Sequence, residues 1–127
     1  MDDLDSDGDG FFCPGDCNNG NATVWSTPSE ALSLILDKSG TSALGSWSPP
    51  ALPGGTSPRY DALASAAASF DTRSCVATDV ATPAFDDAVV PVVGTVRHYL
   101  TRARNACASG TLGIRSDGTE RTAPVCP

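Results

Sequence analysis

The sequence predicts an all-β protein whose body is an antiparallel β-sandwich. Six or seven short segments rich in β-forming residues are separated by glycine and proline turns, and no segment has the pattern of a long helix. The chain has 127 residues, which is the usual size of one domain. Aromatic residues make up only 6% of it, so we expect a thin core that disulfides and metal help to stabilise.

The first two predicted strands form a hairpin. Leucines at every second position of residues 32–37 indicate a strand, and Ser39-Gly40 is a turn signal. Residues 41–48 are the returning strand. The segment 49–58 holds prolines at 49, 50 and 53 and a Gly-Gly pair before it ends at Pro58, and we therefore expect it to be a loop.

The remaining strands are less regular. We expect a strand over residues 59–64, followed by a short irregular or helical turn through the alanines. Residues 85–94 give a short strand that Pro91 interrupts. Residues 96–106 have the best combination of length and β-forming composition, and residues 112–115 are a last strand.

Negative charge is concentrated at the N-terminus. Six aspartates lie within the first sixteen residues, without any lysine or arginine among them: Asp2, Asp3, Asp5, Asp7, Asp9 and Asp16. The rest of the chain holds nine acidic and eight basic residues, so it is almost neutral. Nothing in that balance indicates a nucleic acid as a partner.

The segment Asp5–Gly10 has the D-x-D-x-D-G spacing of a calcium loop. A tightly curled backbone projects alternate side chains toward one point, and glycine at the sixth position permits the sharp turn. In this register a carboxylate falls at the twelfth position, whereas the register that starts at Asp3 places Pro14 there. The expected ligands are Asp5, Asp7, Asp9, Asp16 and the backbone carbonyl of Phe11, with Asp3 and Asn18 as neighbours that a second ion would use.

The donor chemistry favours calcium. Hard oxygen ligands select Ca²⁺ over Zn²⁺, and Mg²⁺ would keep more of its waters. Carboxylates about 4 Å apart repel one another by about 1 kcal/mol per pair in water, so we expect the segment to need a cation to become ordered. The alternative is an acidic tail that is merely solvated.

Residues 2–21 resemble the calcium-binding aspartate loops of thrombospondin type 3 repeats and dockerins. The resemblance lies in DSDGDGFFCPGDCNNGN, with its short cysteine spacing and trailing asparagines. A second full copy of the motif and the helices of an EF-hand are missing. The resemblance implies calcium binding by residues 1–27, a segment that would precede the sandwich of residues 28–127.

The body resembles a fibronectin type III domain, which has an immunoglobulin-like sandwich. The motifs that carry the resemblance are Trp47-Ser48-Pro49-Pro50, a tyrosine at position 60 after a Gly/Pro loop, and the run YLTRARNACASG. The resemblance implies that Trp47 lies in the core. Gly45 departs from the pattern, because a larger apolar residue usually occupies its position, and Arg97 stands where a tyrosine is common.

The same resemblance assigns the two faces of residues 98–104. Tyr99, Thr101 and Ala103 would face the core, whereas His98, Leu100, Arg102 and Arg104 would point outward. We expect the outward arginines to be solvated, or else to meet an acidic surface of another subunit.

Five cysteines in 127 residues indicate an exported protein, and we expect a leader to have been removed or to lie outside this numbering. Cys13 and Cys17 are close enough in sequence to pair. The fibronectin topology implies a bridge between Cys75 and Cys107, which leaves Cys126 for pairing with another subunit. A buried thiol and a Cys107–Cys126 bridge remain alternatives.

Catalysis is not expected. His98 is the only histidine, and neither a G-x-S-x-G motif nor a phosphate-binding glycine loop is present. A zinc site is not expected either, because there is no repeated C-x-x-C motif. No apolar run is long enough to span a membrane.

The sequence therefore predicts a non-enzymatic, secreted, calcium-binding structural or adhesive protein. We expect subunits to associate head to tail, through Ca²⁺ at the acidic segment, into an extracellular filament or tube. The alternative is an accessory module that binds a glycan or a peptide through Trp25, Phe11 or Phe12. Asn21-Ala22-Thr23 is also a glycosylation sequon.

Overall fold

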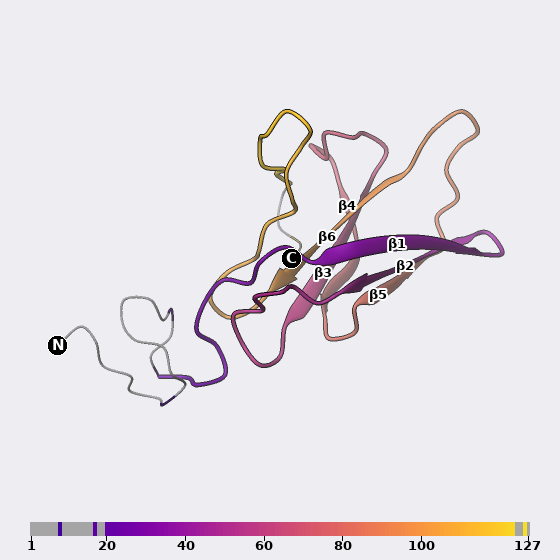
Figure 1. Cartoon of the computed structure of the whole chain (residues 1–127). Helices are drawn as coiled ribbons and strands as arrows, with labels where there is room; N and C mark the ends of the chain where they lie inside the picture. The colour runs from indigo at the N-terminus through magenta and orange to yellow at the C-terminus, as the bar shows by residue number, and fades with distance from the viewer. Residues whose placement is uncertain (1–7, 9–16, 18–19, 124–125, 127) are drawn as a thin grey trace.

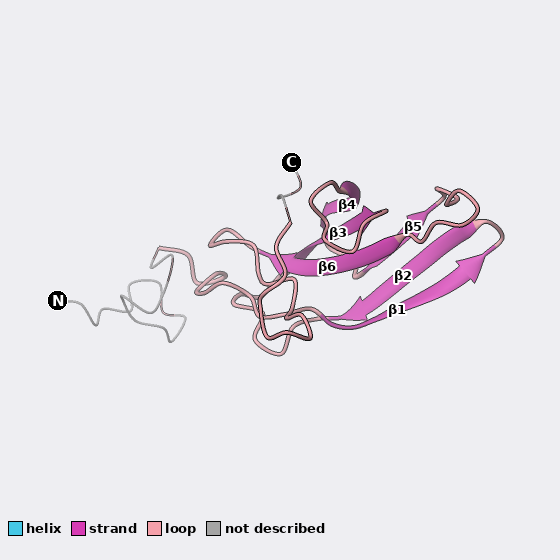
Figure 2. Cartoon of the chain, turned by 90° about the horizontal axis from the view of Figure 1, so that it is seen from above, coloured by secondary structure: helices cyan, strands magenta, loops and turns pink. Residues whose placement is uncertain are grey.

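The structure is a computed structural model that describes residues 20–123 together with Gly8, Cys17 and Cys126. The described part contains six strands in two three-stranded antiparallel sheets (Figure 1). The first sheet has the order β1 (Leu32–Ser39), β2 (Ser42–Ser48), β5 (Ala84–Asp87). The second has the order β4 (Ser74–Val80), β3 (Arg59–Ser65), β6 (His98–Arg104). Seen from above, the sheets form two layers, as predicted (Figure 2).

The first hairpin matches its prediction. Gly40 has φ +61°, which a tight turn between β1 and β2 requires, and Ser39 pairs with Ser42 across it. A register shift follows Leu32, and Ser33 has φ +57° at the irregularity. This bulge interrupts the simple alternation, so Leu34 packs against the core while Leu36 remains half-exposed.

Aromatic side chains join the two sheets. Trp47 of β2 meets Tyr60 of β3 edge to face at 5.6 Å, and Phe85 of β5 stacks on Tyr99 of β6 at 5.1 Å between ring centroids. Such ring pairs contribute about 0.5–1.5 kcal/mol beyond the area that they bury. The prediction that Trp47 lies in the core is confirmed.

Two of the predicted strands differ from the structure. The strand expected over residues 85–94 ends at Asp87, whose carboxylate takes the backbone N–H of Val89, and Pro91 further on has no N–H to donate to a sheet. The strand expected over residues 112–115 is only an isolated bridge between Ile114 and Glu120. Residue patterns did not predict β4, because its sequence SCVATDV has no clear apolar alternation; only the fibronectin resemblance implied a strand that ends near Cys75.

The C-terminal segment packs on the outer side of the second sheet. A second apolar cluster forms there from Leu63, Phe70, Leu112 and Cys126. The chain after β6 turns back and pairs with it only as far as the hydrogen bond from Gly110 N to the Ala103 carbonyl. Beyond that bond, the burial of Leu112 in the second cluster directs the chain away from β6. This second cluster explains why the expected final strand does not form.

One reading of the sequence expected the outward arginines of β6 to be solvated. They instead contact a buried carboxylate. Asp61 is fully buried on β3, and the side chain of Arg102 is 5% exposed. The two are register partners, with 3.6 Å between Arg102 Nε and Asp61 Oδ2. Arg104 donates to the same carboxylate at 3.2 Å, so this chain supplies the acidic partner itself.

Candidate functional site

The predicted calcium ligands lie outside the described residues. This holds for Asp3, Asp5, Asp7, Asp9, Phe11, Asp16 and Asn18, and also for Cys13. Gly8, inside the D-x-D-x-D-G motif, is described and has φ +75°, a conformation that suits a tightly curled loop. Among the described residues, no group of three or more His, Cys, Asp or Glu side chains could hold a metal ion. Calcium binding therefore remains a prediction from the sequence.

Cys17 is attached to the body of the protein. It forms a disulfide with Cys107, with 5.8 Å between the Cα atoms, although the sequence suggested a partner at Cys13. Its backbone N–H also donates to the Trp25 carbonyl at 2.8 Å. Cys107 follows β6 at the end of the sandwich where the chain enters, so the bridge fixes the residue after the acidic segment to that end (Figure 1).

Asn105 holds the same end together. Its Nδ2 donates to the carbonyls of Ser26 at 2.7 Å and Gly54 at 3.3 Å. Its Oδ1 accepts from the backbone N–H of Cys107 at 2.9 Å. One side chain therefore joins the segment before β1, the loop after β2 and the turn that carries the disulfide.

Cys126 is not free for another subunit. It is buried and bridges to Cys75 within the chain, with 5.9 Å between the Cα atoms. The expected Cys75–Cys107 bridge is therefore wrong. The sequence could not reveal this pairing, because the C-terminal segment reaches Cys75 only by crossing the outer face of the second sheet. Two disulfides indicate an extracellular or otherwise oxidising environment.

An exposed apolar loop connects β5 to β6. Residues 88–96, which we call the valine loop, include five exposed valines: Val89, Val90, Val92, Val93 and Val96. Val93 is 99% exposed, and Gly94 turns the chain with φ +86°. The sequence predicts a strand over this segment. The signal for a loop was Pro91 together with Gly94, three residues later.

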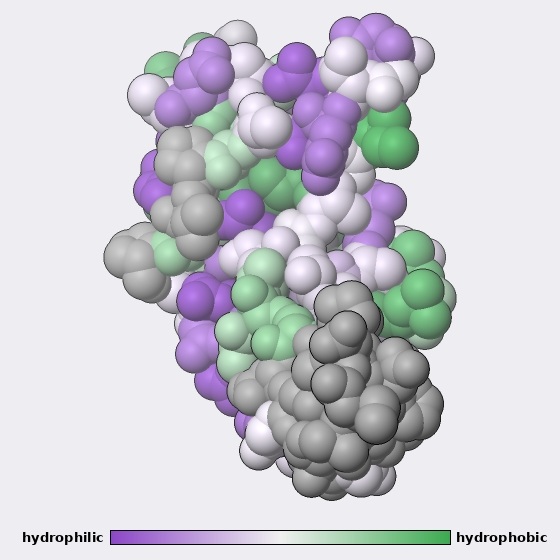
Figure 3. All heavy atoms as spheres, turned by 90° about the vertical axis from the view of Figure 1, so that its left-hand side faces the viewer, coloured by the Kyte–Doolittle hydropathy of each residue, from purple (hydrophilic) through white to green (hydrophobic). Residues whose placement is uncertain are grey.

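The valine loop lies far from the Cys17–Cys107 bridge. In Figure 1 it projects at the upper right, whereas the chain enters at the lower left. Figure 3 faces the end where the chain enters, and there the hydrophobic colour on the described residues is confined to small separate patches. A cluster of exposed valines therefore lies at the end opposite the Cys17–Cys107 bridge.

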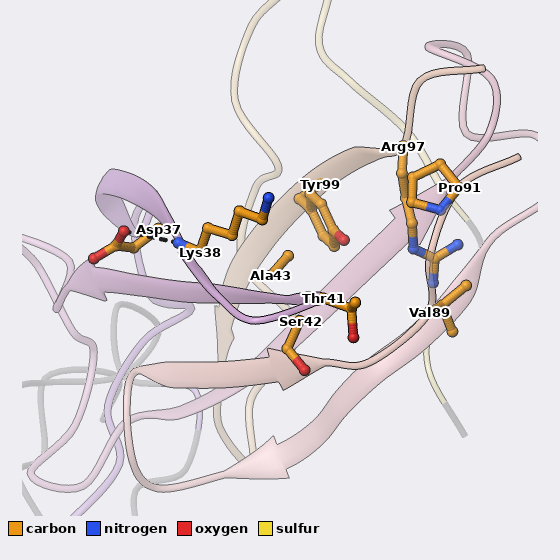
Figure 4. Close-up of a pocket in the computed structure, with 9 residues that line it drawn as sticks. All are labelled: Asp37, Lys38, Thr41, Ser42, Ala43, Val89, Pro91, Arg97 and Tyr99. Atoms are coloured by element: carbon orange, nitrogen blue, oxygen red, sulfur yellow. Dashed lines mark hydrogen bonds between the residues drawn. The ribbon is translucent and has the colours of Figure 1, made fainter. Parts of the chain in front are cut away.

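A pocket of about 240 Å³ lies between the valine loop and the tip of the β1–β2 hairpin (Figure 4). Val89 and Pro91 line one side, and the polar residues Lys38, Thr41 and Ser42 come from the hairpin. The volume is below the ~300–1,000 Å³ of ordinary ligand pockets. It suits one side chain of a partner rather than a whole small molecule.

A carboxylate, a guanidinium and a phenol meet beside this pocket. Asp87 Oδ2 accepts from Arg97 Nε at 2.6 Å and from the Tyr99 hydroxyl at 2.9 Å. Burial alone would raise the pKa of Asp87, but the hydrogen bonds from Arg97, Val89 N–H and Tyr99 lower it below its ordinary value. Burial and the bond to Asp87 raise the pKa of Tyr99. These hydrogen bonds fix the start of β6 against β5.

No protein-family model matches the chain, and no curated protein matches it either. Solved structures do match. Titin kinase with its flanking domains and the titin domains A168–A170 each align with a TM-score of 0.54 and 16% identity over 67% of this chain. A Fn3-like protein from Clostridium thermocellum aligns with a TM-score of 0.51 and 23% identity, over 80% of this chain and 99% of its own.

The fold is an immunoglobulin- and fibronectin III-like β-sandwich. The chain spans only 15% and 29% of the two titin structures, so the Fn3-like sandwich corresponds to a small part of each. At these identities the matches establish the fold alone. Calcium binding by residues 2–21, which their resemblance to aspartate loops implies, stays a prediction. In the described part of the chain, no helix is long and apolar enough to cross a membrane.

Proposed function

We propose that the chain is a non-enzymatic extracellular module with a structural or adhesive role, which binds Ca²⁺ at its N-terminal segment and associates with other copies of itself. The observation that carries the proposal is the contrast between the two ends of the sandwich. A disulfide anchors the residue after the acidic segment at one end, and the exposed valine loop lies at the other.

The donor set fits calcium. Asp5, Asp7, Asp9 and Asp16 would supply carboxylate oxygens and Phe11 a backbone carbonyl, which are the ligand types that Ca²⁺ accepts at six to eight positions. Bound calcium would neutralise part of the acidic segment and hold its backbone curled. The Cys17–Cys107 bridge would then transmit that order to the sandwich.

The valine loop supports association. Monomeric proteins rarely leave several neighbouring valines exposed unless another surface covers them. The loop also adjoins the pocket at the hairpin tip, which would receive one side chain of a partner. Because the Cys17–Cys107 bridge and the valine loop lie at opposite ends, contacts between the two ends of successive copies would be heterologous and, where they do not close into a ring, would build a filament or a tube.

Sedimentation velocity tests this proposal. We expect the wild-type chain to form large particles in Ca²⁺ and to become monomeric in EDTA. Val92→Asp should keep the chain monomeric in Ca²⁺, whereas Ile114→Asp, a similarly exposed residue outside the loop, should leave assembly unchanged. A wild-type chain that is monomeric in both buffers removes the assembly part of the proposal.

The second candidate is an accessory module that binds a peptide or a glycan. The pocket beside Lys38 and Tyr99 favours a peptide (Figure 4). Trp25, the aromatic residue considered for glycans, is partly buried, and its backbone is bonded to Cys17 and Gly54. Peptide binding by a monomer that Lys38→Ala abolishes would support this candidate over self-association.

A further inference from the structure

The sequon Asn21-Ala22-Thr23 lies in an ordered turn at the end where the chain enters. The Val24 N–H donates to the Asn21 carbonyl at 3.1 Å, which closes the turn. The loop after β2 supports it, since Thr56 N–H donates to the Thr23 carbonyl at 3.0 Å and Val24 bridges to Gly55. Ala22 and Thr23 are exposed and Asn21 is partly exposed, so an enzyme can reach the turn from solvent.

The asparagine and threonine side chains of the sequon contact each other directly. The Thr23 hydroxyl donates to Asn21 Oδ1 at 2.6 Å, and the Thr23 backbone N–H donates to the same oxygen at 3.0 Å. This is an Asx turn completed by the hydroxyl. Two donors on Oδ1 draw electron density from the carboxamide and make its N–H group more acidic.

We propose that Asn21 is an acceptor for an N-linked glycan. The donor is an oligosaccharide carried on a polyprenyl diphosphate, and the catalyst is a membrane-bound oligosaccharyltransferase. Asn21 Nδ2 forms a bond to the anomeric carbon, the bond from that carbon to the diphosphate oxygen breaks, and the diphosphate leaves with the electron pair. The Nδ2 proton passes to a carboxylate of the transferase. No oxidant or reductant is needed.

The chain contains a matched site that lacks only the amide. In Asp117-Gly118-Thr119 the Thr119 hydroxyl and N–H donate to Asp117 Oδ1 at 2.6 and 2.9 Å, which reproduces the geometry at Asn21. A carboxylate has no amide nitrogen to glycosylate. Asp117→Asn therefore creates a second sequon in nearly the same conformation, at an exposed position.

The test is secretion of the chain, behind a signal peptide, from a eukaryotic host that glycosylates sequons. Peptide-N-glycosidase in heavy-oxygen water, followed by fragmentation of the tryptic peptide ending at Lys38, reports occupancy, because oxygen-labelled Asp appears at position 21 only where the enzyme removed a glycan, whereas earlier spontaneous deamidation carries no label. We expect wild type and Thr23→Ser to be modified, and Asn21→Gln and Thr23→Ala to be unmodified. Asp117→Asn should carry a second glycan, which the tryptic peptide of residues 116–121 reports in the same way.

Secretion with an unchanged circular dichroism spectrum shows that each variant folds. An unmodified Asn21 in the secreted wild-type chain overturns the proposal, whether or not Asp117→Asn is modified. Modification that persists in Thr23→Ala overturns it as well. The result does not depend on calcium or on assembly.

Discussion

Gly45 of β2 lies directly opposite Phe85 of β5, and the phenyl ring occupies the space that a side chain at position 45 would need. A Cβ atom there would lie 2.6 Å from Phe85 Cδ1 and closer still to Cε1 and Cζ. Phe85 is buried and packs on both Trp47 and Tyr99. The aromatic ring from the neighbouring strand therefore takes the place of the larger apolar residue that the fibronectin pattern expects at 45.

Gly45→Ala should destabilise the fold by about 1–3 kcal/mol, because the ring must leave its packed position. Urea unfolding monitored by fluorescence measures the change. Ser46→Ala, on the exposed side of the same strand, is the control and should change stability by no more than ~0.5 kcal/mol. The double variant Gly45→Ala with Phe85→Leu should lose less unfolding free energy than the sum of the losses in the two single variants. Strict additivity would contradict the proposed clash.

Replacing both Cys75 and Cys126 by alanine should cost about 2–5 kcal/mol, since this bridge fastens the C-terminal segment over Leu63 and Phe70. Thermal unfolding checks the loss. Peptide mapping of the wild-type chain without reduction checks the connectivity directly. A peptide that joins Cys75 to Cys107 would refute the described pairing.

Asp61→Asn should destabilise the chain by about 3–5 kcal/mol, because it leaves the buried Arg102 without its ionised partner. Denaturant unfolding at neutral pH and moderate salt measures this cost. Asp86→Asn, at an exposed position of β5, is the control and should change stability by no more than ~0.5 kcal/mol. Equal effects of the two variants would argue against a buried ion cluster.

Stability should fall in acid through Asp87. Its pKa is lowered in the folded state, so its ionised form stabilises the fold at pH values above the ordinary carboxyl pKa of 3.8. That contribution is lost as the pH falls through the lowered folded value. The difference in unfolding free energy between wild type and Asp87→Asn should therefore shrink between about pH 5 and pH 2. A difference that stays constant with pH would contradict this assignment.

Local patterns in the sequence were sufficient to predict the position of most strands. The Ser39-Gly40 turn, the prolines of residues 49–58 and the β-forming composition of residues 96–106 each act over a few neighbouring residues, so a single sequence contains their signal. β4 has no such signal. It is a strand because β3, one of the most buried segments of the described chain, offers it an edge.

Long-range contacts could not be read in the same way. Cys17 and Cys107 are 90 residues apart, and Cys75 meets Cys126, 51 residues away, beside the cluster that Leu112 forms with Leu63 and Phe70. The burial of Arg102 likewise depends on Asp61, 41 positions earlier, being its register partner. Each of these contacts follows from the topology, which the sequence alone specified only as a class.

Isothermal calorimetry with Ca²⁺ tests the central claim most directly. The account predicts saturable binding, with affinity at least in the roughly millimolar range of extracellular calcium modules. Asp7→Asn with Asp9→Asn should abolish it, whereas Asp86→Asn with Glu120→Gln, which removes the same charge from exposed positions of the body, should not. No binding by the wild-type chain, or equal binding by both double variants, would contradict the account.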